Sequence, residues 1–348
     1  MDRIKLIVPA DREAGRRAAE KWNGIAKPLH SLGLLEDLVI KLAGIYGNEN
    51  FSVDKRCAVA MCADNGVVCE GVTQTDSSVT AIVAKAMAEG SSNINLMAKT
   101  ARADVLPVNI GIKSSLDIPG LIDRKIADGT GNIANGPAMS REQAERSVSV
   151  GIDMVRDLKE KGYNIIVTGE MGIGNTTTSS AVASVLLGLP PEETTGRGAG
   201  LDREGIKRKI AVIRRSIEIN KPDSHDPIDV LSKVGGFDIG GITGLFLGGA
   251  IYRVPIVMDG FISAVSAALA ALICPVSKDY MLCSHVSKEP AGRKVLDFLG
   301  FEPPITAGLC LGEGTGGVLL LPLLDAAMAV YDSAHLFDNL PMEKYKEL

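Results

Sequence analysis

Short apolar runs recur along the chain, and each ends in a glycine or a polar residue. A continuous apolar run of about four to seven residues is typical of a strand that is buried on both faces, as in a parallel sheet. We therefore expect five central strands, within CAVAMCADNG (57–66), ADVLPVNIG (103–111), NIIVTGEMG (164–172), VPIVMDG (254–260) and DYMLCSH (279–285).

Helical stretches lie between these runs, at residues 79–101, 140–162 and 176–188. Ser140, followed three residues later by Gln143, has the spacing of a capping box and predicts the start of the second stretch. Strands that alternate with helices predict an α/β fold with a doubly wound, mostly parallel sheet. Such sheets bind ligands at the carboxyl ends of their strands, where this sequence has Asp64, Asn109, Glu170, Asp259 and His285.

Two segments lie outside this alternation. Residues 1–50 are charged and helical in character, and residues 320–348 have the pattern of a last helix with a polar tail. We expect them to pack together as a small helical lobe formed from both chain termini, beside a large α/β domain at residues 51–319.

One long apolar segment, residues 244–275, carries only Arg253 and Asp259 as charges. Its uninterrupted part, residues 261–274, is shorter than the roughly 20 residues that a membrane-spanning helix needs. We expect a buried strand followed by a buried, alanine-rich helix, and no membrane association.

Composition narrows the class of protein. The 348 residues are 46% apolar and 23% charged, as in an ordinary globular protein, and the net charge of −5 argues against nucleic acid as a partner. Six cysteines without a CxxC pair predict neither a zinc site nor a disulfide framework. Charge throughout residues 1–25 predicts no signal peptide and a cytoplasmic protein. Free thiols beside apolar runs are expected to act as small hydrophobes, at Cys57, Cys274, Cys283 and Cys310.

A first glycine loop, residues 168–184, follows a predicted strand and opens a helix. Backbone N–H groups and the helix dipole hold phosphates at such positions. The spacing of Gly169, Gly174 and Thr176 is that of a P-loop, except that Asn175 stands where the lysine would be. That lysine reaches the outer phosphates of a triphosphate, so its absence favours a ligand with one phosphate. A turn that merely connects strand and helix is the alternative.

A second cluster, TGRGAGLD (195–202), precedes a basic helix at residues 203–215 that contains Lys209. Its ammonium group could complete a phosphate site as a point charge. Alternatively, Lys209 lies on a solvated helix face.

A third cluster, LGEGTGGVLLLP (311–322), places Glu313 among four glycines. Small neighbours let a substrate approach, and the apolar run behind would partly shield the carboxyl from water, which suits a general base. The alternative is an acid that complements a helix dipole. His285, in a polar stretch at residues 284–300, is better interpreted as a hydrogen-bonded structural residue.

Together, several motifs resemble the nicotinate-nucleotide–dimethylbenzimidazole phosphoribosyltransferases, which assemble the lower ligand of cobalamin. The likeness is collinear from about Cys57 to the last helix. It rests on GEMGIGNTT (169–177), TGRGAGLD (195–202), GGFDI (235–239), VMDGFIS (257–263), SHVSKEPAG (284–292) and LGEGTGG (311–317).

The resemblance implies a Rossmann-like homodimer that needs no metal or other cofactor. It implies transfer of ribose 5-phosphate from nicotinate mononucleotide to a benzimidazole-type base, with inversion at the anomeric carbon. Glu313 would be the general base, Glu170 would lie near the ribose, and the acceptor base would lie near Thr73, Thr80 and Leu311. The phosphate would bind at Gly172, Ile173, Gly174, Asn175 and Thr176, helped by Lys209 and Ser287.

Two departures from the family pattern leave the acceptor open. Family members commonly have Asp-His-Gly after the first strand, where this chain has Asn65 in the middle position, and the loop at 73–81 is unusually polar. We place both on the acceptor side, so the base could be another benzimidazole, a purine or a phenol. A non-catalytic nucleotide-binding protein is a further alternative. An NAD-dependent dehydrogenase is disfavoured because no strand–GxGxxG–helix unit is followed by an acidic strand end.

Overall fold

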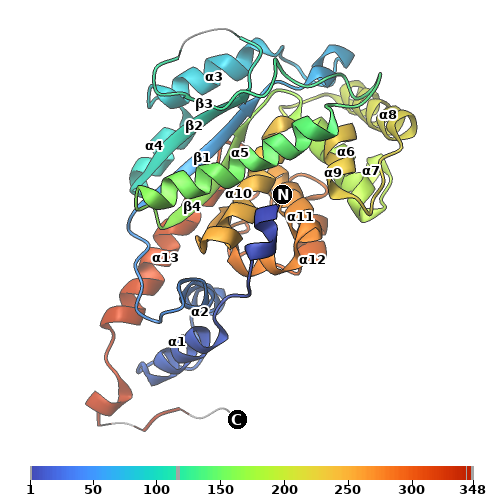
Figure 1. The fold of residues 1–348 in the computed structure, drawn as a ribbon. Helices are drawn as coiled ribbons and strands as arrows, with labels where there is room; N and C mark the ends of the chain where they lie inside the picture. The colour runs from blue at the N-terminus through green and yellow to red at the C-terminus, as the bar shows by residue number, and fades with distance from the viewer. Residues whose placement is uncertain (1, 115–117, 342, 346–348) are drawn as a thin grey trace.

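Six parallel strands form one sheet in the computed structural model, which describes residues 2–114, 118–341 and 343–345 (Figure 1). The strand order β3-β2-β1-β4-β5-β6 is that of a doubly wound Rossmann-like sheet. The fold class and all five expected strands are confirmed. The strands are β1 (Arg56–Ala63), β2 (Ala103–Gly111), β3 (Ile122–Asp123), β4 (Ile165–Met171), β5 (Ile256–Met258) and β6 (Met281–Cys283).

β1 shows why its sequence is apolar throughout. All eight of its residues are buried, and they alternate between two cores. Cys57, Val59, Met61 and Ala63 pack with residues of α5 (Arg141–Glu160) and α10 (Phe237–Tyr252). Ala58, Ala60 and Cys62 pack on the other face, with α3 (Ser78–Ala88), α4 (Asn93–Thr100) and α13 (Thr315–Ser333).

The helices follow the expected pattern with one correction. The stretch 79–101 is two helices, because α3 ends before Gly90, whose φ of +79° breaks the helical path, and α4 starts three residues later. α5 begins at the predicted capping box, in which Ser140 and Gln143 each accept a hydrogen bond from the other's backbone N–H. The remaining α-helices between β4 and α13 are α6 (Asn175–Leu187), α7 (Pro191–Thr194), α8 (Arg203–Asn220), α9 (Pro227–Val234), α11 (Phe261–Ile273) and α12 (Gly292–Leu299).

α5 and α10 pack backbone to backbone. A Cβ built on Gly151 would lie 2.0 Å from the carbonyl oxygen of Gly241, and one on Gly244 would lie 2.0 Å from the carbonyl oxygen of Val148. Such close approach requires glycine on both helices. Part of the high glycine content therefore serves helix packing and not ligand-binding turns.

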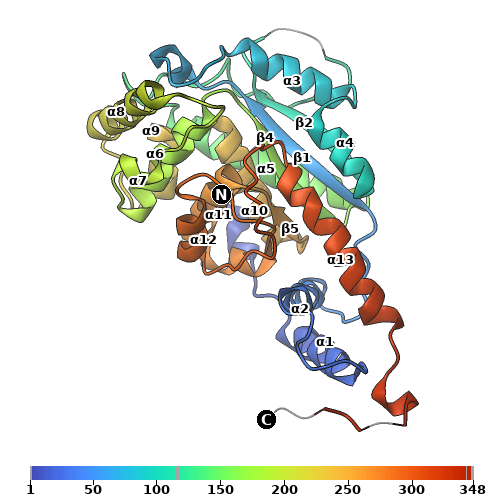
Figure 2. The same ribbon diagram turned by 180° about the vertical axis from the view of Figure 1, so that it is seen from behind.

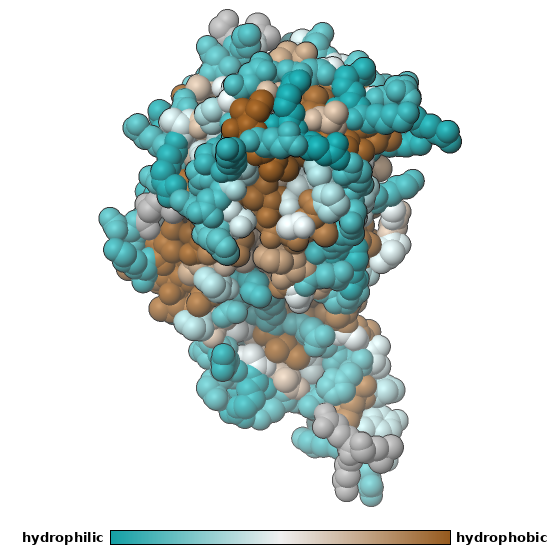
Figure 3. Space-filling view, turned by 90° about the vertical axis from the view of Figure 1, so that its right-hand side faces the viewer, coloured by the Kyte–Doolittle hydropathy of each residue, from teal (hydrophilic) through white to brown (hydrophobic). Residues whose placement is uncertain are grey.

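Residues 12–46 and the C-terminal end of the chain lie together, away from the sheet, whereas the first residues, Asp2–Leu6 (η1), lie against the larger body beside α10 (Figures 1 and 2). α1 (Arg12–Gly24) and α2 (Leu34–Tyr46) pack against the second half of α13 around Trp22, Met328 and Tyr331. This part projects from the larger body in the space-filling view (Figure 3). α13 runs without a break through the expected boundary at 319/320, so the division into domains stays a prediction.

Among the helices of the described residues, α13 alone has the length and the apolar composition that a membrane-spanning helix needs. Its apolar 18-residue window is 56% buried inside the structure. The long apolar segment at 244–275 forms the end of α10, then β5 and the buried, alanine-rich α11, as expected.

Candidate active site

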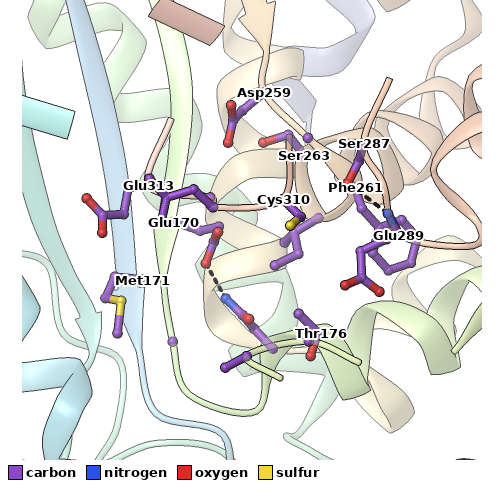
Figure 4. A pocket seen from close by; sticks show the side chains of 18 of the residues that line it. Glu170, Met171, Thr176, Asp259, Phe261, Ser263, Ser287, Glu289, Cys310 and Glu313 are labelled. Carbon is purple, nitrogen blue, oxygen red and sulfur yellow. Dashed lines mark hydrogen bonds between the residues drawn. The ribbon is translucent and has the colours of Figure 1, made fainter. Parts of the chain in front are cut away.

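A cavity opens at the carboxyl ends of β4, β5 and β6, next to the point between β1 and β4 where the strand order reverses (Figure 4). Doubly wound sheets bind ligands at this position. Eight of the residues expected in the site line the cavity: Glu170, Gly172, Ile173, Asn175, Thr176, Ser287, Leu311 and Glu313. The other lining residues are Met171, Gly198, Ala199, Asp259, Gly260, Phe261, Ile262, Ser263, His285, Glu289, Cys310 and Gly312.

The loop after β4 forms the N-terminus of α6. Gly174 is the N-cap residue, with a φ of +93° that favours glycine, and no side chain caps the helix. Gly172 packs so closely on β1 that a Cβ would lie 2.5 Å from the carbonyl oxygen of Ala63. The positive end of the α6 dipole therefore faces the cavity with small residues in front of it, which suits an anion.

Lys209 lies behind Thr176 at this end of the cavity and does not itself line it. Its side chain is fully buried on α8, and its Nζ donates a hydrogen bond of 2.7 Å to Thr176 Oγ1. Burial lowers the pKa of Lys209 to about 8, against the opposing effect of the Glu289 carboxylate. Lys209 thus points at Thr176 at the start of α6 and does not lie on a solvated helix face.

Glu170 is the penultimate residue of β4 and lines the cavity. Its Oε2 accepts a hydrogen bond from Asn175 Nδ2 (Figure 4). Burial and the carboxylates of Asp238 and Asp259 raise the pKa of Glu170 to about 8, and burial raises the pKa of Asp238 to about 6. Glu170 is therefore largely protonated at neutral pH and can donate a hydrogen bond.

Glu313 lies at the opposite end of the cavity from the phosphate loop. Its φ of +64° is flanked by values of +86° and +98° at Gly312 and Gly314, so three consecutive residues have left-handed backbone. Its side chain is 8% exposed. The Oε2 atom accepts a hydrogen bond of 3.2 Å from the backbone N–H of Ile94, and Oε1 accepts one of 3.4 Å from Asn93 Nδ2.

These contacts bear on the alternative interpretation of Glu313. Asn93 and Ile94 begin α4, so the carboxylate does complement a helix N-terminus, although that helix is not its own. Glu313 nevertheless lines the cavity. In Figure 4, Glu313 and Met171 lie to one side of Glu170, and Thr176, Ser287 and Glu289 lie to the other. The site thus has two ends that meet at Glu170.

Asp259 and His285 also line the cavity, although sequence reasoning gave neither a role in the site. The two oxygens of Asp259 accept hydrogen bonds from the backbone N–H groups of Gly314 and Gly317. Burial raises the pKa of Asp259 and lowers that of His285, and each residue opposes the other's shift. His285 Nδ1 is hydrogen-bonded to Ser284 Oγ at 2.9 Å, in line with the structural interpretation. The sequence signal for Asp259 and His285 was their position one and two residues after the ends of β5 and β6, at the edge where such sheets bind ligands.

The residues expected near the acceptor base are only partly brought together. Thr80 is buried, and its Oγ1 accepts a hydrogen bond of 3.2 Å from the N–H of Ile173. Leu311 lies at the cavity rim and is 56% exposed. Thr73 does not line the cavity, because its hydroxyl turns back to accept a hydrogen bond from the N–H of Thr75.

Asn65 packs against the loop before α6, since its Nδ2 is 3.5 Å from the carbonyl oxygen of Ile173 and its Cβ lies against Gly174. Ile173 also donates a hydrogen bond to Thr80, so the place of Asn65 beside the acceptor base stays a prediction. One further expectation needs correction. Cys310 is exposed at the cavity, whereas Cys57 and Cys283 are buried as expected. Within the described part of the chain, no group of three or more His, Cys, Asp or Glu side chains is arranged to hold a metal ion.

Comparison with known proteins assigns the chain to a family. A family model described as phosphoribosyltransferase matches residues 7–340. Relatives from Ruminiclostridium cellulolyticum and Acetivibrio thermocellus, both named nicotinate-nucleotide–dimethylbenzimidazole phosphoribosyltransferase, are 46% and 47% identical over 345 and 343 residues. Each alignment covers 99% of this chain and 98% of the relative. A solved structure with that name from Thermus thermophilus has a TM-score of 0.88 at 36% identity and covers 94% of this chain and 98% of its own.

Proposed function

The chain belongs to the nicotinate-nucleotide–dimethylbenzimidazole phosphoribosyltransferase family, and we propose that it transfers ribose 5-phosphate from nicotinate mononucleotide to 5,6-dimethylbenzimidazole. The products are α-ribazole 5′-phosphate, a precursor of the cobalamin lower ligand, and nicotinate. One observation carries the proposal: a carboxylate, Glu313, and a helix N-terminus with a buried lysine, Lys209, serve opposite ends of one cavity.

The phosphate of nicotinate mononucleotide binds at the start of α6. Backbone N–H groups and the helix dipole supply fixed partial positive charge there, and Lys209 adds a full charge. The Ser287 hydroxyl, at the cavity wall, is a further donor. The residues in contact with the phosphate are Gly172, Ile173, Gly174, Asn175 and Thr176.

Glu170 orients the ribose. As a protonated acid at neutral pH it donates a hydrogen bond to a ribose hydroxyl, while Asn175 holds its other oxygen. This arrangement adds no negative charge close to the phosphate.

Glu313 takes the proton in the transfer step. The pyridinium nitrogen of the nicotinate ring already weakens the glycosidic bond, so the transition state has oxocarbenium character at the ribose carbon. One imidazole nitrogen of the base attacks that carbon from the face opposite nicotinate, while the carboxylate of Glu313 accepts the proton of the other nitrogen. The bond to nicotinate breaks, its electron pair returns to the pyridine nitrogen, and the β-linkage becomes α. Positioning and one proton transfer supply the catalysis.

The acceptor base lies between Glu313 and α3, beside Met171, Thr80 and Leu311. The loop at 73–81, which contains Thr80, is more polar than the family pattern, so other benzimidazoles, purines and phenols are alternative acceptors. A screen of these bases with nicotinate mononucleotide, with products identified by mass, ranks them.

We also infer a homodimer, supported by the family resemblance, and a cytoplasmic location, supported by the charge pattern of residues 1–25. Size-exclusion chromatography with light scattering and fractionation of cells measure these two properties.

The decisive experiment for the activity supplies nicotinate mononucleotide and dimethylbenzimidazole to the purified protein. Release of nicotinate together with the mass of α-ribazole phosphate supports the proposal. Binding of nicotinate mononucleotide without any product after long incubation, with every base in the screen, contradicts it and favours a non-catalytic nucleotide-binding protein.

A further inference from the structure

We propose that Asp259 is a positioning residue that holds the Glu313 carboxylate where it takes the proton from the acceptor base. The inference rests on the proposed function and deepens it. Asp259 directly follows β5, whereas Glu313 precedes α13, so the contact joins two separate walls of the cavity.

The contact is made by both oxygens of one carboxylate. Asp259 Oδ2 accepts a hydrogen bond of 3.2 Å from the N–H of Gly314, and Oδ1 accepts one of 2.9 Å from the N–H of Gly317. Gly314 is the N-cap residue of α13 and has no side chain to cap the helix itself. Asp259 therefore supplies the missing cap from another element, one peptide bond away from Glu313.

The backbone of Glu313 needs such support. Its φ of +64° is disfavoured for a residue with a side chain, and a disfavoured conformation persists only where the surroundings determine it. Gly169 contributes on the β4 side, because a Cβ there would lie 2.4 Å from the carbonyl oxygen of Glu313. Asp259 and Gly169 thus hold the backbone from which the Glu313 side chain extends, and Asn93 and Ile94 hold its carboxylate.

Asp259 is itself fixed in place. Its backbone N–H donates a hydrogen bond of 3.1 Å to Thr168 Oγ1, and that hydroxyl is also bonded to the carbonyl oxygen of Val257 and to Ser263 Oγ. On the other side of the glycine turn, the His285 ring packs where a Cβ on Gly316 would lie at 2.0 Å. Asp259, directly after β5, is thus bonded to β4 through its backbone N–H and to the start of α13 through its carboxylate.

Asp259 lines the cavity, so two other roles compete with positioning: direct contact with the ribose, and general support of the fold. The variant Asp259→Asn keeps the size of the side chain but has only one oxygen acceptor, so one of the two N–H groups loses its partner. Since a misplacement of about 1 Å costs about a hundredfold in rate, we expect kcat to fall about a hundredfold. The KM for nicotinate mononucleotide should change little. A large rise in KM with kcat unchanged would overturn the inference and indicate contact with substrate.

A double variant separates positioning from an independent effect on the ribose. If Asp259 acts through Glu313, adding Asp259→Asn to Glu313→Gln produces no further loss in single-turnover rate. Another hundredfold loss overturns the inference but leaves the role of Glu313 intact. Full activity of Glu313→Gln alone overturns both.

Asp325→Asn is the matched control, because Asp325 lies on the same helix and its ion pairs with Arg56 and Arg102 lie far from the cavity. It should lower the melting temperature without lowering kcat. An equal loss of kcat in Asp325→Asn would mean that loosening α13 is sufficient, and would overturn the inference.

If Asp259→Asn fails to fold, Thr168→Val removes the acceptor of the Asp259 N–H and should give a smaller loss of kcat, again with KM unchanged. Unchanged kcat in a folded Thr168→Val would contradict the coupling.

Discussion

Lys209 on α8 donates a hydrogen bond of 2.7 Å to the hydroxyl of Thr176 on α6, and its ammonium group is fully buried. A buried lysine whose hydrogen-bond partner is neutral is costly, since its charge has left water. Burial lowers the pKa of Lys209 to about 8, although the Glu289 carboxylate opposes the shift. A phosphate bound at the start of α6 would supply a further negative charge, so the cost of burying Lys209 is offset when substrate binds.

Replacing Lys209 by glutamine should weaken substrate binding. A hydrogen bond to a charged group contributes about 1.5–3 kcal/mol, so the KM for nicotinate mononucleotide should rise roughly ten- to a hundredfold. Steady-state kinetics with the base saturating measures it. Lys207→Gln, an exposed lysine on the same helix paired with Glu204, is the control and should leave KM unchanged. Equal KM values for the two variants would remove Lys209 from the phosphate site.

Glu170 should make the stability of the protein depend on pH. Its pKa is raised from 4.5 to about 8 in the folded state, so the folded protein binds the proton more tightly than the unfolded chain does. The contribution is complete below about pH 4.5 and is lost as pH rises through 8. Glu170→Gln should therefore melt at a higher temperature than the parent protein at pH 8 and above, with a difference that shrinks towards pH 5. A difference in melting temperature that is constant over this range would contradict the raised pKa.

Gly316 should not tolerate a side chain. The Cβ of alanine would meet the His285 ring at 2.0 Å, next to the turn that carries Glu313. Overpacking of this kind costs about 1–3 kcal/mol, so Gly316→Ala should lower the free energy of unfolding by that amount and reduce kcat. Gly136→Ala, with no atom within 4 Å of the new Cβ, is the control, and urea denaturation compares the two. Equal stability would show that the turn can shift.

Features that depend on neighbours in the sequence could be predicted. The capping box at Ser140 is local, and the run at residues 103–111 matches the bounds of β2, an inner strand whose second half is mostly buried. β3 was missed because Ile122 and Asp123 form only two rungs beside β2 and need no apolar run. The glycines of α10 gave no helix-packing signal, since their partner Gly151 lies on α5.

The site was predictable where one loop carries it. The phosphate loop and Glu313 are each contained in a short glycine motif, and the structure brings both to one cavity. The role of Asp259 was not predictable, because its partners Gly314 and Gly317 lie 55 and 58 residues further along the chain. The contact of Asn65 with Ile173 was not predictable for the same reason, since the two residues lie 108 positions apart in the chain.

The central claim is that Glu313 takes the proton of the acceptor base at one end of a cavity whose other end binds the phosphate. The most direct test compares Glu313→Gln with the parent protein in nicotinate release from nicotinate mononucleotide and dimethylbenzimidazole, with binding of nicotinate mononucleotide measured by calorimetry. We predict that release falls at least about a hundredfold, in the range of 10²–10⁴ typical of general base catalysis, while the dissociation constant stays within about threefold. Undiminished release by a folded Glu313→Gln protein would contradict the account.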